Sequence, residues 1–450
     1  MMKRSLTRGI CLIIALMFVA ALGLTGCGQK EAPKAEEPKQ EAAAPQKEEP
    51  KKEEPKQQEP KKLKLAMFSP EQDTTYKKLN IVDAVKKAKN IDLEIEKFKD
   101  STDFENAMKI RKAANELPDV FGLKPYQLAL YKDILLPLDG TDFEQNNLYA
   151  KSYAMDGKVL GVPECSFNEF VWYRKSIFQE LNLSVPKTWP EFVEVGKKIK
   201  ASGKYIPLLM GQKDDWTNYP FTEFMPALIA NDGALWNKMA TQDEPFGKDG
   251  PFYQAFAKYK QLIDQNVLDK SLLGAGNDQL KVMFGSKKGA MAAFGAWFYS
   301  EIGTQLNGDF SDVGAFLLPV ADKAEDPFRT IVMVDGFWAT PKDGKNVEAA
   351  KEFMSWYFSE EWYLPYMKDR ALVSTVKGLK AEIPATVQEA LDAQKYEAVV
   401  YDAGNDEFVK LQNATKFNFK KMGQDLLAGK DIDKMMDDMN KAWKAARAAK

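Results

Sequence analysis

The chain contains no histidine among its 450 residues, which leaves carboxylates, lysines and three cysteines as the groups that could do chemistry. Without an imidazole, the chain cannot build a Ser-His-Asp triad, a Cys-His pair or the usual proton shuttle near neutral pH. A zinc site is disfavoured because its ligands come mostly from histidine and cysteine. A carboxylate pair of the glycosidase kind stays open by count alone. Nothing in the sequence points to such a pair, and histidine is missing, so we expect no metal, no cofactor and no catalytic activity.

Cys27 is the cysteine with the most informative surroundings. Three basic residues near the N-terminus precede an apolar run at 10–24, and the quartet Leu24-Thr25-Gly26-Cys27 follows. This order is typical of a secretory signal peptide, here residues 1–26, and the run is shorter than the roughly 20 residues of a membrane span. The quartet resembles the bacterial lipobox, which implies an acylated Cys27 at the mature N-terminus. Two acyl chains would then hold the protein on a bilayer. The alternative is an ordinary secretion signal in which Cys27 is incidental.

The segment after Cys27 is built almost entirely from Glu, Lys, Pro, Gln and Ala. It has no large aliphatic or aromatic residue, so it cannot bury enough surface to offset the entropy of ordering. Its regularly spaced prolines oppose a helix and favour extended polyproline II. The sequence thus predicts a disordered spacer over residues 27–62 and a folded part from about Leu63 to Lys450.

Cys165 is expected to be the one cysteine of the folded part, because Cys11 leaves with the signal peptide. It has no partner for an internal disulfide, and we expect a buried, small apolar side chain rather than a reactive thiol. The net charge of −2 argues against a nucleic-acid partner, which would require a basic surplus.

The folded part alternates between strand and helix patterns. Strands are expected at 63–68 and 92–98, and a capping box at Thr102-Asp103-Phe104-Glu105 predicts a helix with Ala107, Ile110, Ala114 and Leu117 on its buried face. A second capping box, Thr188-Trp189-Pro190-Glu191, predicts another helix. This alternation favours an α/β fold with largely parallel sheets.

Four stretches, in this order, carry a family resemblance: Leu117-Pro118-Asp119-Val120-Phe121, Met155-Asp156-Gly157-Lys158-Val159-Leu160-Gly161-Val162-Pro163, Val171-Trp172-Tyr173-Arg174-Lys175-Ser176-Ile177-Phe178 followed by Pro186-Lys187-Thr188-Trp189-Pro190-Glu191-Phe192, and Gly289-Ala290-Met291-Ala292-Ala293-Phe294-Gly295-Ala296-Trp297. Together they resemble the extracellular solute-binding protein family 1, the maltose-binding-protein-like receptors of ABC importers. Arg174 departs from the asparagine that is usual in this family.

The resemblance implies a two-lobed, periplasmic-binding-protein-like fold of type II, with hinge crossings near 167–171, 334–337 and 369–373. The first lobe would comprise 63–168 and 335–369, and the second 169–334 and 370–450. It also implies a monomer that closes on a carbohydrate, an oligosaccharide in our reading, and delivers it to the permease subunits of an ABC transporter. With the acylated Cys27 in the lipid bilayer, the protein would sit on the outer face of a Gram-positive-type membrane.

Sugars present an apolar C–H face and a rim of hydroxyls, so their sites pair aromatic platforms with charged and amide groups. Trp189, Trp356 and Trp362 lie on helical faces and are expected in the core. The residues expected to bind the ligand, by family position and side-chain type, are Trp297, Trp338, Trp216, Asp335, Glu71, Lys124, Tyr126, Tyr219 and Arg370.

Two other functions remain open from the sequence. The same fold could bind a polyamine, a ferric ion or a phosphorylated compound. A surface-anchored enzyme acting on cell-wall glycans is the alternative from a different class.

Overall fold

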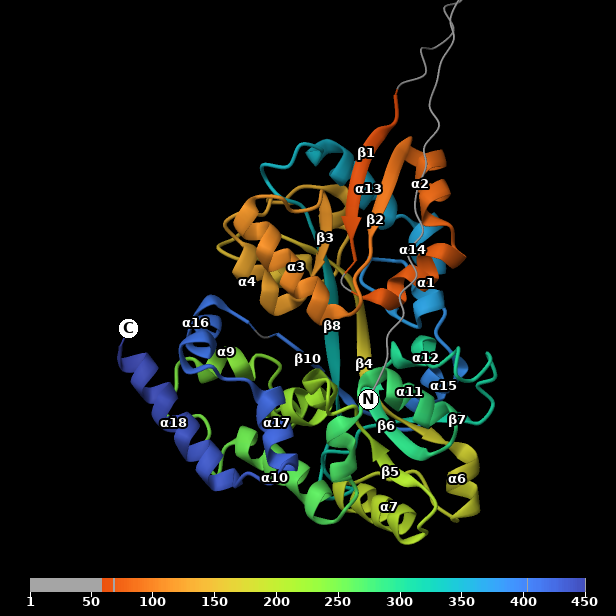
Figure 1. The fold of residues 1–450 in the computed structure, drawn as a ribbon, viewed down its shortest axis with the longest axis vertical. Helices are drawn as coiled ribbons and strands as arrows, with labels where there is room; N and C mark the ends of the chain where they lie inside the picture. Colours follow the sequence, from red (N-terminus) through yellow and green to blue (C-terminus); the bar gives the residue numbers. More distant parts are fainter. Residues whose placement is uncertain (1–58, 68, 403, 450) are drawn as a thin grey trace, which may run out of the picture. The chain divides into compact units, whose positions relative to one another are not determined.

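The structure, a computed structural model, describes residues 59–449 apart from Phe68 and Ala403 (Figure 1). The predicted signal peptide, Cys27 and most of the predicted spacer lie outside these residues. Across the described residues, no helix is both long enough and apolar enough to cross a bilayer.

The N-terminal strands form a parallel group. β1 (Lys61–Ala66) pairs with β2 (Ile91–Glu96) on one side and with β3 (Val120–Leu123) on the other. Leu63 and Leu65 are buried whereas Lys64 between them is exposed, which is the period of two expected for a strand. Lys61 and Lys62 belong to this strand, so the sheet begins two residues inside the predicted spacer. Backbone pairing with β2 orders them, although their side chains bury little surface.

Two long strands connect this group to the rest of the sheet. β8 (Arg329–Ala339) lies antiparallel to β3 and to the first half of β4 (Val162–Arg174), where the pairing runs from Val162 opposite Trp338 to Asn168 opposite Val332. From Glu169 onward, β4 pairs instead with β6 (Gly289–Gly295) and β7 (Val313–Leu317). β4 therefore changes partners between Asn168 and Glu169.

The remaining strands extend the mixed sheet on both sides of this change. β5 (Ile206–Leu209) runs parallel to β6, and β10 (Glu397–Val400) runs parallel to the start of β8. β9 (Val373–Ser374) pairs with Cys165 and Ser166, which belong to the half of β4 that also pairs with β8.

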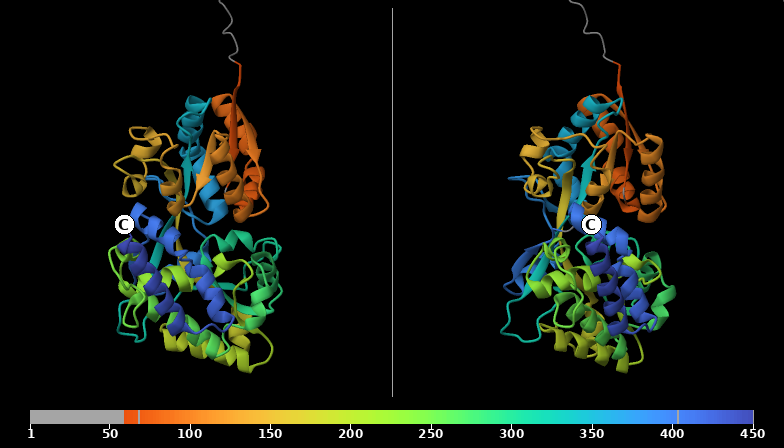
Figure 2. Two further views of the ribbon diagram at one scale, coloured as in Figure 1. Left: turned by 60° about the vertical axis from the view of Figure 1, so that its left-hand side comes forward. Right: turned by 90° about the vertical axis from the view of Figure 1, so that its left-hand side faces the viewer.

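Helices cover both parts of the sheet, as Figure 2 shows from two further sides. Those grouped around β1–β3 are α1 (Pro70–Lys78), α2 (Ile81–Lys89), α3 (Ser101–Ala114), α4 (Leu128–Tyr131), α5 (Asp142–Gln145), α13 (Val347–Tyr357) and α14 (Glu360–Arg370). Those grouped around β5–β7 and the C-terminal segment are α6 (Lys175–Glu180), α7 (Trp189–Ala201), α8 (Met225–Ala230), α9 (Leu235–Met239), α10 (Pro251–Asp264), α11 (Asn277–Gly285), α12 (Phe298–Glu301), α15 (Ala385–Asp392), α16 (Asp406–Thr415), α17 (Phe419–Leu427) and α18 (Ile432–Ala448).

The two predicted capping boxes have different outcomes. Thr188 caps α7 as expected, its hydroxyl accepting from the amide of Glu191. For α3 the prediction is wrong, because Asp100 is the cap and the helix already begins at Ser101. The predicted buried face is also wrong. Phe104 and Met108 face the core, and Ile110, about 240° around the helix from Phe104, is 70% exposed.

The tryptophans predicted to be core residues, Trp189, Trp356 and Trp362, are all buried, which confirms that part of the prediction.

Cys165 is likewise buried, and burial raises the pKa of its thiol well above the usual range. Arg174, the departure from the family pattern, is buried too, and its guanidinium pairs with Asp312 at 2.8 Å. This ion pair explains how the fold accommodates an arginine there.

A polar network lies inside the core around Glu164 of β4, which is 1% exposed. Its carboxylate accepts hydrogen bonds from the indole of Trp338 at 3.0 Å and from the hydroxyl of Tyr357. Burial raises the pKa of Glu164 to about 7, although the bond from Tyr357 and the charge of Arg370 favour the ionised form. The folded protein therefore holds a proton here that the unfolded chain releases at lower pH.

We expect Trp236→Ala to lower the free energy of unfolding by about 3–5 kcal/mol, because large aromatic truncations in a core leave a cavity. Trp236 is fully buried among Phe252, Phe408, Phe417 and Phe419, and so ties α16 and α17 to α9 and α10. Ile110→Ala is the control and should change stability by less than about 0.5 kcal/mol. Urea unfolding of both variants measures the difference, and equal losses would contradict the observed orientation of α3.

We expect stability to fall as pH rises from about 4.5 to about 7, because the raised pKa of Glu164 lets only the folded state keep its proton in that interval. Glu164→Gln keeps an acceptor for Trp338 but cannot titrate. Its unfolding free energy should therefore lose a pH-dependent part on the order of 1–3 kcal/mol. Denaturant unfolding at several pH values tests this, and parallel curves for the two proteins would refute it.

Candidate ligand-binding site

Ligands of open α/β sheets bind outside the carboxyl ends of the parallel strands. Here β1 leads into Ser69–Gln72, β3 into Lys124–Gln127, β5 into residues 210–219, and β6 into Gly295–Trp297. These loops hold six of the nine predicted ligand residues, namely Glu71, Lys124, Tyr126, Trp216, Tyr219 and Trp297. The other three lie on β8 (Asp335 and Trp338) and at the end of α14 (Arg370).

Four rings form what we call the aromatic group: Trp216, Tyr219, Phe294 and Trp297. The ring centroid of Trp216 lies 5.9 Å from that of Trp297 and 6.4 Å from that of Tyr219, with which it is stacked at 24°. Phe294 lies 5.3 Å from Trp297 and is fully buried, whereas both tryptophans are partly exposed. The sequence predicted three of these four residues, and the fold brings them together.

Gly295 is the point of closest approach beneath the aromatic group. A Cβ at this position would lie 2.6 Å from Nε1 of Trp297 and 2.6 Å from a ring carbon of Phe167. Such distances are too short for carbon, so only glycine allows β6 and the Trp297 loop to pack against β4. Gly295 stands opposite Glu169 in the ladder between β4 and β6.

A short hydrogen-bonded chain joins the aromatic group to β4. The hydroxyl of Tyr219 accepts from the backbone N–H of Gly295 at 2.9 Å and donates to Oε2 of Glu169 at 2.9 Å. Glu169 is buried, and its Oε1 has no hydrogen-bond partner. Burial raises the pKa of Glu169 well above its usual range, and the negative charge of Glu223 raises it further, against the bond from Tyr219.

Lys124 and Asp335 form an ion pair between the loop after β3 and strand β8, with 2.6 Å between Nζ and Oδ2. Tyr126, in the same loop as Lys124, donates its hydroxyl to Glu105 at 2.8 Å. The backbone of Tyr126 also packs closely on Gly404, where an added Cβ would lie 3.0 Å from the Cα of Tyr126. The loop after β3 is thus held from α3, from β8 and from the C-terminal segment.

Glu71 and Arg370 belong to a partly buried charged group that also contains Lys281 and Glu301. Nζ of Lys281 on α11 lies 3.5 Å from Glu71 on α1 and 3.6 Å from Glu301 on α12. Burial and the charge of Glu71 raise the pKa of Glu301 to about 8, while Lys281 and Arg370 act in the opposite direction. These charges link α1 and α14 on one side to α11 and α12 on the other.

Trp338 is the most deeply buried of the nine predicted ligand residues. It is 1% exposed, donates its indole N–H to Glu164, and packs against Tyr357 at 5.4 Å between ring centroids. A stacking platform needs an exposed ring face, which Trp338 lacks because β8 turns this position toward α13. The structure thus gives Trp338 a core position.

Sequence reasoning missed Glu169, Phe167, Lys281 and Glu301. A signal for Glu169 was present, since it is one of two acids in a thirteen-residue strand with eleven buried positions. The pairing of Lys281 with Glu71, 210 residues away, had no signal in the sequence.

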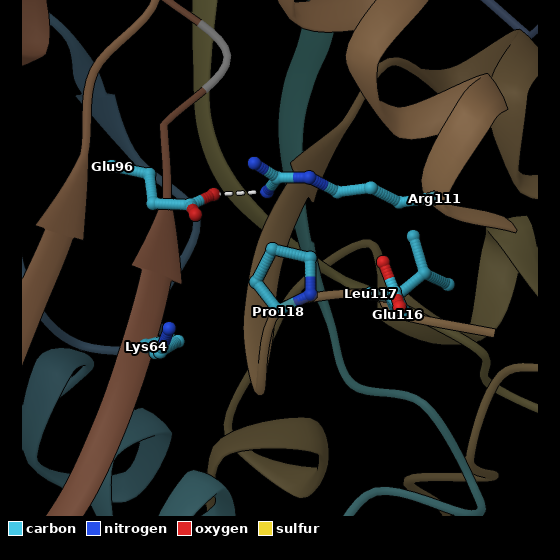
Figure 3. A pocket seen from close by; sticks show the side chains of 6 residues that line it. All are labelled: Lys64, Glu96, Arg111, Glu116, Leu117 and Pro118. Atoms are coloured by element: carbon cyan, nitrogen blue, oxygen red, sulfur yellow. Dashed lines mark hydrogen bonds and ion pairs between the residues drawn. The ribbon is translucent and has the colours of Figure 1, made fainter. Parts of the chain in front are cut away.

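A hollow of about 320 Å³ lies elsewhere, between β1, β2, α3 and the approach to β3 (Figure 3). Its walls are Lys64, Glu96, Arg111 and residues 116–118, and the guanidinium of Arg111 pairs with Glu96 across it. It offers no aromatic face, so we assign no ligand to it. Within the described part of the chain, no three acidic or cysteine side chains are grouped to hold a metal ion.

Comparison with known proteins gives solute-binding relatives, among them sugar-binding proteins and, over a short stretch of 51 residues, sn-glycerol-3-phosphate-binding proteins. The chain is 25% identical to the "Multiple sugar-binding protein" of Streptococcus mutans over 55% of this chain and 60% of that protein. It is 26% identical to the "Diacetylchitobiose binding protein NgcE" of Streptomyces coelicolor over 58% of this chain and 54% of that protein. These matches span little more than half the length of either relative.

A solved structure confirms the fold. The BlMnBP1 binding protein of an ABC transporter from Bifidobacterium animalis subsp. lactis, in complex with mannobiose, superposes with a TM-score of 0.74. The match covers 87% of this chain and 95% of that one at 20% identity. This likeness confirms the predicted two-lobed α/β fold.

The profile of the bacterial extracellular solute-binding proteins matches residues 69–363, about two thirds of the chain. The matched region contains β3 to β8, and with them the aromatic group and the Lys124–Asp335 pair. The chain belongs to the bacterial extracellular solute-binding protein family.

Proposed function

We propose that this protein captures a carbohydrate, in particular an oligosaccharide, and delivers it to the permease subunits of an ABC importer. The observation that carries the proposal is the aromatic group, in which two partly exposed indoles lie 5.9 Å apart at the carboxyl ends of parallel strands. The sugar-binding relatives support the same ligand class. The protein acts as a receptor, without a catalytic step of its own.

The chemistry of the site suits a sugar. Trp216 and Trp297 offer apolar ring faces for the C–H face of a pyranose, and aromatic contacts of this kind contribute about 0.5–1.5 kcal/mol beyond area burial. Charged donors and acceptors for the sugar hydroxyls come from two places. One is the pair Lys124 and Asp335, and the other is Glu71 with Arg370. We therefore keep eight of the predicted residues as proposed ligand contacts and leave out Trp338.

The proposed signal to the transporter is closure of the two lobes. We propose that lobe 63–168 with 335–369 and lobe 169–334 with 370–450 move about β4 and β8, near the position where β4 changes partners. A sugar that contacts both lobes binds the closed form more tightly, and so shifts the equilibrium by its differential affinity. As a monomer, one chain would carry the complete site.

We further propose that acylated Cys27 anchors the protein on the outer face of the membrane, with residues 28–60, up to the start of β1, as an extended spacer. Such a spacer would let the folded part reach solutes away from the bilayer while staying close to the permease.

A calorimetric titration tests the ligand class, with mannobiose, diacetylchitobiose and short gluco- and galacto-oligosaccharides as probes. Spermidine and glycerol 3-phosphate test the same fold with another ligand, and chromatography of each sugar after incubation tests for hydrolysis. Binding of a sugar without products supports the proposal. Binding of spermidine alone, or cleavage of a sugar, would refute it.

We expect Trp297→Ala to weaken binding of the tightest sugar by at least about tenfold, equivalent to about 1.4 kcal/mol, because the stacking face is lost. The matched control is Trp356→Ala, a buried tryptophan of α13 outside the site. That variant should melt at a lower temperature and bind with nearly unchanged affinity. Titration and thermal unfolding of both variants decide the matter, and normal binding by Trp297→Ala would place the site elsewhere.

We expect Cys27→Ser to release the protein from membranes, because an acyl group can no longer be attached. Fractionation of cells that express each form, with a high-salt wash of the membrane pellet, measures the change. A mutant that stays in the washed pellet would contradict the anchor.

A further inference from the structure

Glu169 occupies a place in the site that its side chain does not obviously suit. It is 3% exposed, in a strand whose neighbours Phe170 and Val171 are fully buried. A carboxyl group in such surroundings costs free energy unless its polar atoms are paired. One oxygen accepts from Tyr219, and the other has no hydrogen-bond partner.

The contacts of Tyr219 show what this carboxyl holds in place. The Tyr219 hydroxyl accepts from the backbone N–H of Gly295 and donates to Glu169, so its orientation is set from two directions. Its ring stacks on Trp216, which in turn contacts Trp297. Glu169 thus stands at the buried end of a chain that leads to both exposed indoles.

We propose that Glu169 is a positioning residue of the sugar site, which acts through Tyr219 to hold Trp216 and Trp297 in the orientation that stacks on the ligand. The inference rests on the proposed function for its ligand class, and adds to it a residue that does not itself touch the sugar. It also gives the unusual buried acid a role.

The surroundings of Glu169 make this support sensitive to pH. The charged group that faces it is Glu223 on η4 (Pro220–Phe224), a like charge. Glu223 is itself bound by the hydroxyl of Tyr401 at 2.8 Å and lies 3.7 Å from Nζ of Lys420. The carboxyl of Glu169 accepts its hydrogen bond from the hydroxyl of Tyr219. On β6, the residue directly opposite Glu169 is Gly295, which has no side chain.

Ionisation would therefore place a negative charge on an oxygen that no donor meets. The carboxylate would draw water beneath Tyr219 and loosen the stack. The pKa of Glu169 is raised, so the neutral form, which binds, persists above the usual range for glutamate and is lost as pH rises further. We expect the affinity for sugar to fall with rising pH for this reason.

The first test is a double-mutant cycle on sugar affinity. Glu169→Leu and Tyr219→Phe each remove one end of the hydrogen bond, and each should weaken binding at least about fivefold because the remaining polar group or ring loses its support. If Glu169 acts through Tyr219, the double variant should bind the sugar as tightly as the single variant that has the lower affinity. Effects that multiply, or a Glu169→Leu variant that binds normally, would overturn the inference.

The second test separates positioning from general stability. Glu169→Gln keeps an oxygen that accepts from Tyr219 and cannot ionise, so it should restore most of the affinity lost in Glu169→Leu and bind without the fall at high pH. Glu94→Leu, which removes an exposed glutamate on β2, is the control and should leave affinity unchanged. A pH dependence that persists in Glu169→Gln would overturn the inference.

A third measurement does not depend on the ligand. The tryptophan fluorescence of the ligand-free protein should show a titration step that disappears in Glu169→Gln, because the contacts that lead from Glu169 through Tyr219 reach Trp216 and Trp297. If no sugar binds but the step is present and lost in the variant, the proposed ligand class fails while the positioning role stands. If sugar binds and the two proteins titrate identically, the positioning role fails alone.

Discussion

The pairing of β4 with β8 is the constraint on which the rest of the structure depends. Their antiparallel ladder runs from Val162 opposite Trp338 to Asn168 opposite Val332 and joins the strands around β1 to those around β6. Because residues directly opposite share a face, the ladder also decides which side chains meet. Asp335 stands opposite Cys165, and Glu169 follows four residues later on the same face of β4, beyond Phe167. The opposite face carries Glu164 and Trp338 into the core.

This division of faces explains why two buried glutamates of one strand have different surroundings. The carboxylate of Glu164 is met by an indole, a tyrosine hydroxyl and the charge of Arg370, which favour its ionised form and partly offset the effect of burial on its pKa. Glu169 has a single donor and a like-charged neighbour. An unpaired buried oxygen is costly, and natural proteins keep few of them. Its location beneath the aromatic group therefore points to a use in the site.

The charged group around Lys281 adds a second link between the two parts of the fold. Lys281 lies between Glu71 and Glu301, with Arg370 close by, and the four residues come from four different helices. Lys281 on α11 and Glu71 on α1 carry opposite charges, so their electrostatic interaction energy depends on how closely the two helices approach.

What the sequence determined by itself was local or carried by motifs. Strand and helix alternation indicated the α/β class, the hydroxyl of Thr188 marked the start of α7, and the four stretches indicated the family. Where the signal depended on which way a helix or strand faces, only the tertiary structure decided. Ile110 looked apolar enough for the core but lies on the outer side of α3, because Phe104 and Met108, on another face of the helix, supply the contacts with the core. Trp338 looked like a platform but faces Glu164, because the register of β8 on β4 turns it inward. Glu169 and Lys281 pair with residues 50 and 210 positions away, and such pairings arise only when the tertiary structure is assembled.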